Sequence, residues 1–309
     1  MILVSGLLNI ETNVKVKGFP IPYFPIDYPF FKINSNISGV GYNIGKAMTT
    51  LGDEIKLLSF IGNDAEGKRI RATLQEMQID ISYIKTELKA TPTSVVLYDD
   101  EGKRQVYCDL KDVQDQTYTS EGIEEMMEAC DALILCNINF NKELLKVARK
   151  MKKLIASDIH VIHDAYDGYN KPFMMSSDIL FLSDENLPCA PEEFIMKLEK
   201  LYHNKIIVIG QGKKGAMMYV KEENKIYQLG SVEIREVVNT IGAGDALFSS
   251  FIHYYVKGKK PLEALKRAEI FAAYKIGESG GATGFADEQI IDELYTKTVF
   301  QELVIPTEN

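Results

Sequence analysis

The chain has 309 residues, 35 basic and 44 acidic side chains, and a formal net charge of −9. This acidic balance excludes a general nucleic-acid binder, which needs a basic face to displace counterions. A chain of this length buries roughly 75% of the surface of its unfolded form, so it needs neither disulfides nor a structural metal to fold.

The N-terminal residues predict the first strand of a sheet. Ile2–Leu8 is an apolar run without a preceding basic segment, which is not typical of a signal peptide. No run of about 18 apolar residues occurs, which argues against a membrane span. The four cysteines show no C-x-x-C pairing, as is usual for reduced thiols. We therefore expect a cytoplasmic protein.

Two segments predict a small β-layer that stands off the main sheet as a lid. Residues 12–37 contain four prolines and many aromatic residues without a helical period. Residues 92–110 contain two short strand patterns around an acidic turn. Between the two, apolar residues at helical spacing predict a helix that follows Gly41 and ends at Gly52.

The middle of the chain alternates between apolar strands and amphipathic helices. The predicted strands are Ala132–Cys136, Ile159–Ile162, Ile179–Leu182 and Lys205–Ile209, and the predicted helices include Glu143–Met151 and Pro191–Leu201. This alternation is typical of a parallel sheet covered on both faces. His160 and His163 fall in one of these strand patterns and are expected to pack on opposite faces.

The pattern changes again in the last third of the chain. Ala216–Val220 and Lys225–Gln228 predict two strands around a turn, and from about Val237 the pattern is helical to the end. No linker or repeat divides the sequence. We therefore predict one α/β domain that carries a β lid.

The segment Asn239–Asp245, Asn-Thr-Ile-Gly-Ala-Gly-Asp, predicts an anion site at the start of a helix. Its small residues Gly242, Ala243 and Gly244 leave the first backbone N–H groups of the helix accessible. The carboxylate of Asp245 follows in the first turn and can take a proton from a hydroxyl. The alternative is a glycine-rich helix start in which Asp245 only complements the helix dipole.

This segment resembles the C-terminal signature of the PfkB (ribokinase-like) family of sugar and nucleoside kinases. The companion N-terminal signature is similar to Ser38–Asn43, Leu51-Gly52 and Gly62–Gly67, about 200 residues earlier. The resemblance covers nearly the whole chain. It implies a ribokinase-like three-layer α/β/α sandwich over residues 1–309, with a mostly parallel central sheet and a small β-sheet lid.

The resemblance also implies a mechanism. Asp245 would be the base that deprotonates the acceptor hydroxyl, and the amides of Gly242, Ala243 and Gly244 would form the anion hole. ATP would be the phosphoryl donor, and Mg²⁺ would bridge its phosphates.

The same resemblance assigns an acceptor site to residues near the N-terminus. They are Asn9, Glu11, Gly39, Gly41 and Asn43. Glu11 stands where ribokinases carry Asp, which argues against an identical sugar. Asn9 alone also fits a turn after a strand. Arg104 either contacts the substrate or is an exposed strand charge, and the exposed charge is the simpler interpretation.

For the nucleotide, the resemblance points to Gly212, Gly215, Thr240 and Gly281. Gly210–Gly215 is formally a G-x-G-x-x-G sequence, but a strand follows it where a dinucleotide fingerprint needs a helix. A Rossmann site is therefore rejected, and the segment matches the strand–turn–strand near the nucleotide in the family.

Two departures from the family pattern concern metal ions. Ser183-Asp184-Glu185-Asn186 stands where the family often has Asn-x-x-Glu, so Asp184 and Glu185 are the candidate groups near Mg²⁺. The alternative is an acidic loop before a helix. Asn239 replaces the Asp that helps to bind a monovalent cation in K⁺-activated relatives, which leaves K⁺ dependence open.

The resulting prediction is an ATP-dependent kinase that phosphorylates an alcohol of a small sugar. One alternative is a nucleoside kinase, because aromatic residues of segment 12–37 such as Tyr23, Phe24 and Tyr28 could stack on a base. Another is a ligand-binding regulatory protein without turnover. A homodimer through the lid is a candidate assembly, because an open β-layer has edges and apolar surface to cover.

Overall fold

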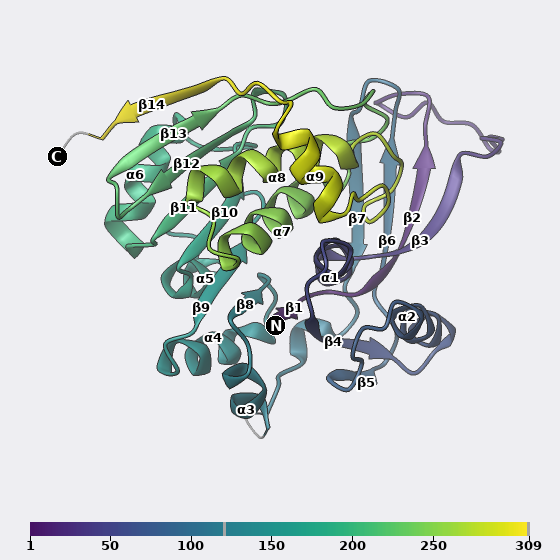
Figure 1. Ribbon diagram of the computed structural model, residues 1–309. Helices are drawn as coiled ribbons and strands as arrows, with labels where there is room; N and C mark the ends of the chain where they lie inside the picture. Colours follow the sequence, from purple (N-terminus) through teal and green to yellow (C-terminus); the bar gives the residue numbers. More distant parts are fainter. Residues whose placement is uncertain (120–121, 308–309) are drawn as a thin grey trace.

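The computed structural model describes residues 1–119 and 122–307, and within them a ten-stranded sheet forms the body of the molecule (Figure 1). Its strands are β1 (Ile2–Ser5), β4 (Ile55–Gly62), β5 (Ile84–Leu88), β8 (Ala132–Leu135), β9 (Leu154–Asp158), β10 (Ile179–Ser183), β11 (Ile206–Gly210), β12 (Ala216–Val220), β13 (Lys225–Leu229) and β14 (Glu302–Pro306). They lie in the order β14-β13-β12-β11-β10-β9-β8-β1-β4-β5. The strands from β5 to β11 pair in parallel, and β12, β13 and β14 continue the sheet antiparallel.

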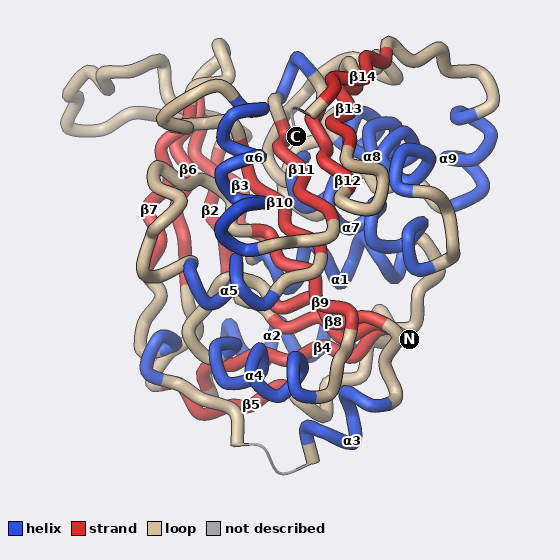
Figure 2. The backbone as a smooth tube through the Cα atoms, turned by 90° about the vertical axis from the view of Figure 1, so that its left-hand side faces the viewer, coloured by secondary structure: helices blue, strands red, loops and turns tan. Residues whose placement is uncertain are grey.

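Helices cover both faces of this sheet. They are α1 (Val40–Thr50), α2 (Ala65–Glu76), α3 (Ile123–Glu128), α4 (Asn141–Lys150), α5 (Lys171–Ser176), α6 (Pro191–Tyr202), α7 (Ala243–Val256), α8 (Pro261–Lys275) and α9 (Glu288–Tyr295). Helices α4, α5 and α6 lie on one side of the strands in Figure 2, and α7, α8 and α9 lie on the other. No helix in residues 1–119 or 122–307 is long and apolar enough to cross a membrane.

The alternation of strand side chains builds two cores, one under each helical layer. Ile2 and Val4 of β1 join the core beneath α1, α7 and α8, whereas Leu3 between them joins the core beneath α3 to α6. Successive side chains of a strand point to opposite faces, so a strand that is buried on both faces must be apolar throughout. This is why the body strands were recognisable as continuous apolar runs.

A second, four-stranded sheet stands beside the body at the right of Figure 1. Its strands, in the order β3-β2-β6-β7, are β2 (Asn9–Lys15), β3 (Ile33–Ser38), β6 (Thr93–Tyr98) and β7 (Arg104–Asp109). They come from the two segments that the sequence predicts as a lid, so the mostly parallel sheet with a β lid is confirmed. We call this sheet the lid.

The outer part of the lid carries exposed apolar side chains. The loop between β2 and β3 leaves Tyr23 88% and Phe31 99% exposed, and Val106 and Tyr107 of β7 are also exposed. This loop projects furthest from the body in Figure 1. The homodimer through the lid stays a prediction.

Glycines allow the chain to pass from the body into the lid. Gly6 follows β1, and the start of α1 crosses over it, where the Gly41 amide donates to the Leu7 carbonyl at 3.0 Å. A Cβ on Gly41 would lie 2.8 Å from the carbonyl carbon and oxygen of Gly6. The two backbones therefore meet at a distance that excludes side chains at this point.

The N-terminal signature also contains a structural tie. Asp64 caps α2 by accepting from the Gly67 amide at 2.8 Å, and it accepts from the amide and the hydroxyl of Thr91 at 2.8 and 2.6 Å. The hydrogen bonds lower the pKa of Asp64, against the effect of its partial burial. Since Thr91 leads into β6, this carboxylate links α2 to the lid.

Three sequence predictions about elements were wrong. The strand predicted at Ile159–Ile162 is β9, Leu154–Asp158, because the buried polar side chains of Ser157 and Asp158 interrupt its apolar pattern. His160 and His163 therefore follow the strand instead of lying in it.

The other two errors concern the ends of elements. The first strand stops at Ser5 because the chain then crosses to the lid. The C-terminal region is not helical to the end, because β14 adds an exposed edge strand beside β13. Such an edge strand lacks the buried face that would give it an alternating pattern.

The close crossing at Gly6 generates a stability prediction with a control in the same helix. Gly41→Ala should lower the free energy of unfolding by roughly 1–3 kcal/mol, the usual cost of overpacking. Gly45→Ala places its Cβ 3.1 Å from the flexible end of Ile55 and gains helix propensity, so it should stay within about 1 kcal/mol of wild type. Urea unfolding of both variants measures the difference, and equal stabilities would contradict the crossing.

Candidate active site

The carboxyl ends of three neighbouring parallel strands and the start of α7 form the candidate site. β9 ends at Asp158, β10 at Ser183 and β11 at Gly210, and backbone hydrogen bonds tie the three ends together. The crevice at the carboxyl ends of parallel strands is where α/β sheets bind ligands. The site is therefore at the position that the topology favours.

Asp245 lies in the first turn of α7 and is buried, with 9% of its surface exposed. It accepts a hydrogen bond of 2.8 Å from the side-chain amide of Asn43 in α1. Burial raises the pKa of Asp245 to about 6, while His160, Asn43 and Lys275 oppose this rise and the Asp158 carboxylate adds to it. The carboxyl group is therefore ionised at neutral pH, but it binds a proton more readily than an exposed aspartate does.

Two titratable neighbours of Asp245, Asp158 and His160, were not among the predicted site residues. The Asp158 carboxylate accepts from the His160 amide at 2.8 Å, and its other oxygen lies 3.5 Å from His160 Nδ1. They were missed because the strand was placed at Ile159–Ile162. The correct placement of β9 puts both residues at the carboxyl edge of the sheet.

The three small residues before Asp245 shape the start of α7. Gly242 has φ of 78° and would carry a Cβ into the carbonyl of Gly281, so only glycine suits this position. Gly244 is exposed and has open space around it. Among the described residues, no hydrogen-bond acceptor is recorded for the amides of Gly242 and Gly244. These N–H groups are available to an anion at the positive end of the helix.

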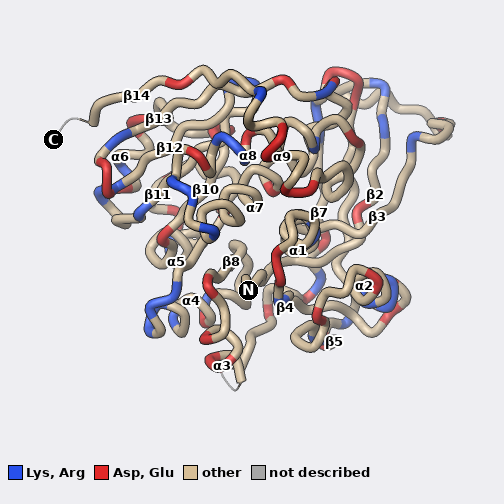
Figure 3. The backbone as a smooth tube through the Cα atoms, viewed as in Figure 1, with Lys and Arg blue, Asp and Glu red and all other residues tan. Residues whose placement is uncertain are grey.

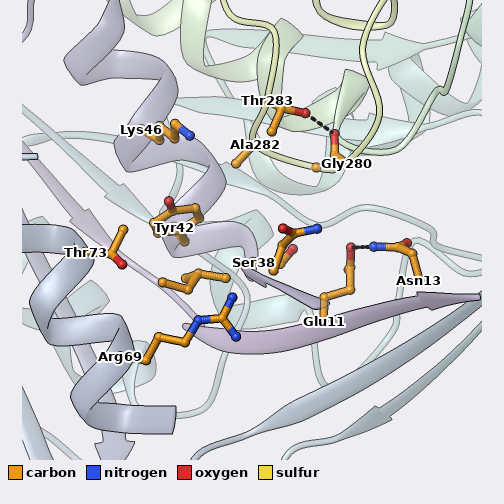
Figure 4. A pocket seen from close by; sticks show the side chains of 13 residues that line it. Glu11, Asn13, Ser38, Tyr42, Lys46, Arg69, Thr73, Gly280, Ala282 and Thr283 are labelled. Atoms are coloured by element: carbon orange, nitrogen blue, oxygen red, sulfur yellow. Dashed lines mark hydrogen bonds between the residues drawn. The ribbon is translucent and has the colours of Figure 1, made fainter. Parts of the chain in front are cut away.

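A polar pocket lies between the lid, α1, α2 and loop 279–284 (Figure 4). Its lining residues are Glu11, Asn13, Asn36, Ile37, Ser38, Tyr42, Lys46, Arg69, Thr73 and Gly280 to Thr283. Gly281 connects the pocket with Asp245, because a Cβ on it would lie 3.0 Å from the Asn43 amide. The lid and the body thus share one pocket beside the buried carboxylate.

Polar side chains of β2 face this region at every second position. Asn9 donates to the Ser94 hydroxyl at 2.8 Å, and Asn13 donates to Glu11 at 3.1 Å. The amide oxygens of Asn9, Asn13 and Asn43 are buried without a hydrogen-bond partner among the described residues. Buried polar atoms are normally paired. A ligand that donates several hydrogen bonds, such as a polyol, would satisfy them.

The other predicted acceptor residues differ in their placement. Gly39 has φ of 99°, and a Cβ there would meet the Leu7 carbonyl. Gly39 and Gly41 therefore serve the close packing of α1 against the crossing chain. Arg104 lies on the exposed strand β7 and is absent from the pocket lining.

The predicted nucleotide residues come from three loops. Gly215 has φ of 88°, and a Cβ there would strike the carbonyl of Leu229. Glycine is therefore required where the turn before β12 packs against the end of β13. Gly212 has open space around it in the turn after β11. The carbonyl of the exposed Thr240 accepts from the Ala243 amide at 3.2 Å. Gly281 lines the pocket and packs against Gly242.

Acidic groups at the sheet edge could accompany a metal. Asp184 follows β10 and is half-buried, and its amide donates to the Gly210 carbonyl at 2.9 Å, whereas Glu185 is exposed. No cluster of three or more metal-binding side chains occurs in the described part of the chain. Mg²⁺ that arrives with phosphates needs only one or two carboxylates, however, so Asp158 and Asp184 suit it.

Comparisons with known proteins agree with this geometry. A family model described as pfkB family carbohydrate kinase matches residues 1–288. The acarbose 7(IV)-phosphotransferase of Actinoplanes sp. is 23% identical over 276 residues, which cover 88% of this chain and 91% of that protein.

Solved structures show the same fold. A microbiome-derived acarbose kinase aligns with a TM-score of 0.86 at 22% identity, over 96% of this chain and 98% of the other. The nucleoside kinase of Methanocaldococcus jannaschii, an archaeal member of the ribokinase family, aligns with a TM-score of 0.78 at 18% identity, over 96% and 98% of the two chains. The ribokinase-like fold is therefore confirmed.

The hydrogen bond between Asn43 and Asp245 generates a titration prediction. Asn43→Leu removes a donor that favours the carboxylate, so the pKa of Asp245 should rise above its wild-type value of about 6. A ¹³C NMR titration of the Asp245 carboxyl carbon measures this shift. Asn34→Leu on the exposed strand β3 is the control and should change nothing. A midpoint that is unaffected by Asn43→Leu would contradict the interaction.

Proposed function

The chain belongs to the pfkB family of carbohydrate kinases, and from this premise we propose that Asp245 is the base of an ATP-dependent phosphoryl transfer to a sugar hydroxyl. The observation that carries the proposal is the buried carboxylate at the start of α7, bonded to Asn43 beside a polar pocket. A carboxylate with a pKa of about 6 accepts a proton more readily than an exposed one.

In the proposed reaction, the acceptor hydroxyl gives its proton to Asp245 as its oxygen attacks the γ-phosphorus. The bond from that phosphorus to the bridging oxygen of ATP breaks, and ADP leaves with the electron pair. The free amides of Gly242 and Gly244 stabilise the charge on the transferred group, since they are donors fixed before the reaction starts, whereas the amide of Ala243 already donates to the Thr240 carbonyl.

The proposed site attracts a nucleotide locally and not through bulk charge. Basic and acidic residues are interspersed along the chain (Figure 3), and the net charge is −9. The start of α7 supplies oriented amides. Mg²⁺, when bound with the nucleotide, neutralises phosphate charge, and Asp158 and Asp184 are the proposed residues that would hold its waters or the ion itself.

The lining of the pocket favours a sugar as acceptor. Its carboxylate and amide oxygens accept hydrogen bonds from hydroxyl groups, and Tyr42 is the aromatic residue in the described lining. The lid-loop residues Tyr23, Phe24 and Tyr28, which motivate a nucleoside acceptor, are 57–88% exposed and do not line the pocket. A nucleoside kinase stays the second candidate, supported by the structural likeness to one.

The role of Asp245 is tested by Asp245→Asn, which keeps the size of the side chain. Removal of the base should lower kcat by roughly 10²- to 10⁴-fold, while the thermal midpoint stays near that of wild type. Asp131→Asn is the control, because Asp131 pairs with the N-terminal amine at 2.8 Å, at the surface. Turnover of Asp245→Asn within tenfold of wild type would refute the assignment.

The acceptor class is tested with a panel of free sugars, oligosaccharides and nucleosides in the presence of Mg·ATP. We expect ADP release with one or more sugars, because the pocket offers acceptors for hydroxyl groups, and none with nucleosides, because the exposed lid-loop aromatic residues that could stack on a base do not line the pocket. Turnover with nucleosides alone would support the second candidate. Sugar binding without ADP release from any acceptor would favour a regulatory protein.

A further inference from the structure

Lys275 is a buried cation to which the proposed reaction gives no role. It is the last residue of α8 and is fully buried, with 0% of its surface exposed. Its ammonium donates a hydrogen bond to the backbone carbonyl of Ile241. Lysine is almost never fully buried unless its charge is paired, because desolvation is costly. This position therefore calls for a specific explanation.

The end of α8 holds the segment that leads into α7. The carbonyl of Ile276 accepts from the amides of Val238 and Asn239 at 2.8 and 3.0 Å. The adjacent Lys275 side chain holds the carbonyl of Ile241. Two consecutive residues thus fix both ends of the stretch from Val238 to Ile241, immediately before the proposed anion hole.

The contact with the Ile241 carbonyl determines the direction of an anion-hole donor. In a planar trans peptide, the C=O of one residue and the N–H of the next point in opposite directions. The ammonium of Lys275 on the Ile241 carbonyl therefore directs the amide of Gly242 away from Lys275. That amide has no recorded acceptor within the described residues and is free to bind an anion.

The surroundings of Lys275 favour its charged form. Burial lowers the pKa of Lys275 to about 8, and the carboxylates of Asp245 and Glu11 oppose this decrease. The side chain is thus mostly protonated at neutral pH. The positive charge of Lys275 therefore lies behind the anion hole and near the proposed base, where it can stabilise the negative charge of a phosphoryl group.

The residues around this cation do not suit K⁺. Oxygen atoms of backbone carbonyls and carboxylates are the usual ligands of hard cations. Here Asn239 is neutral and its side-chain oxygen accepts from the Ile241 amide at 2.7 Å. The Ile241 carbonyl is already bound by Lys275. The Asn239 side-chain oxygen and the carbonyls of Thr240 and Ile241 are therefore already used within the protein.

We propose that Lys275 is a positioning residue whose buried ammonium is the resident cation of the anion-hole segment and makes phosphoryl transfer independent of K⁺. The inference rests on the proposed function. The inference goes beyond the proposed function because it names the side chain of α8 that sets the direction of the Gly242 amide.

The first test uses the wild-type protein. Its kcat and its affinity for a Mg·ATP analogue that cannot be hydrolysed should agree within about twofold between potassium chloride and tetramethylammonium chloride, since the cation is built in. Activation by K⁺ of roughly tenfold or more would overturn the proposal. This arm requires no variant and is independent of whether a substituted protein folds.

The second test replaces the cation. Lys275→Met should lower kcat by roughly 10- to 100-fold, somewhat less than the loss of an oxyanion-hole donor, and weaken binding of the analogue. Lys266→Met is the control on the same helix, where Lys266 pairs with Glu302 of β14, and it should resemble wild type. Unchanged kcat and analogue affinity in Lys275→Met would overturn the proposal.

Chemical rescue separates the charge from a merely structural role. Ethylammonium should restore the kcat of Lys275→Ala by roughly tenfold, whereas the neutral 1-propanol should not, because only the first supplies an ammonium. Equal effects of the two compounds would overturn the proposal.

Binding of the Mg·ATP analogue, measured by isothermal titration calorimetry, separates this proposal from the kinase assignment. If no acceptor is phosphorylated, the proposed function fails, but the affinity of wild type and Lys275→Met for the nucleotide analogue still decides the role of Lys275. An approximately tenfold weaker affinity in the variant supports that role, and equal affinities exclude it.

Discussion

The start of α7 is the constraint on which the rest of the site depends. Gly242 must adopt a positive φ against Gly281, and Asp245 follows it in the first turn of α7. Asn43 from α1 and Lys275 from α8 hold the two ends of this arrangement. Because these contacts come from helices packed on one face of the sheet, the core beneath them supports the geometry of the site.

The candidate site is formed by residues of both the lid and the body. The sheet edge supplies Asp158 and Asp184, and the start of α7 supplies donors, but the pocket itself needs β2 and β3 of the lid. Asp64 links α2 to the residue that leads into β6. Gly41, in the N-terminal signature, allows α1 to cross the chain at Gly6, where the chain leaves β1 for the lid. Several signature residues thus join the lid and the body and need not contact substrate.

The sequence was informative wherever one residue type satisfies a strict local requirement. The glycines and the carboxylate of Gly242–Asp245 were predicted because a helix start that binds anions needs small residues and exposed amides. Body strands that are buried on both faces were evident as apolar runs. Asp158 and His160 were missed because the polar residue Ser157 breaks the apolar pattern of the strand. Ser157 is nevertheless buried, and its hydroxyl donates to the Leu135 carbonyl at 2.8 Å. Lys275 was missed because a lysine near a helix end normally complements the dipole at the surface, and its burial depends on tertiary packing.

The central claim is that α7 binds the transferred phosphoryl group and that Asp245 faces the acceptor hydroxyl. The most direct measurement is a crystal structure with Mg·ADP, aluminium fluoride and a sugar that the enzyme phosphorylates. We predict the fluoride group within about 2.7–3.1 Å of the Gly242 and Gly244 amides, and an Asp245 oxygen within hydrogen-bond distance of the acceptor hydroxyl. Phosphates bound away from α7, or an acceptor hydroxyl that does not contact Asp245, would contradict the account.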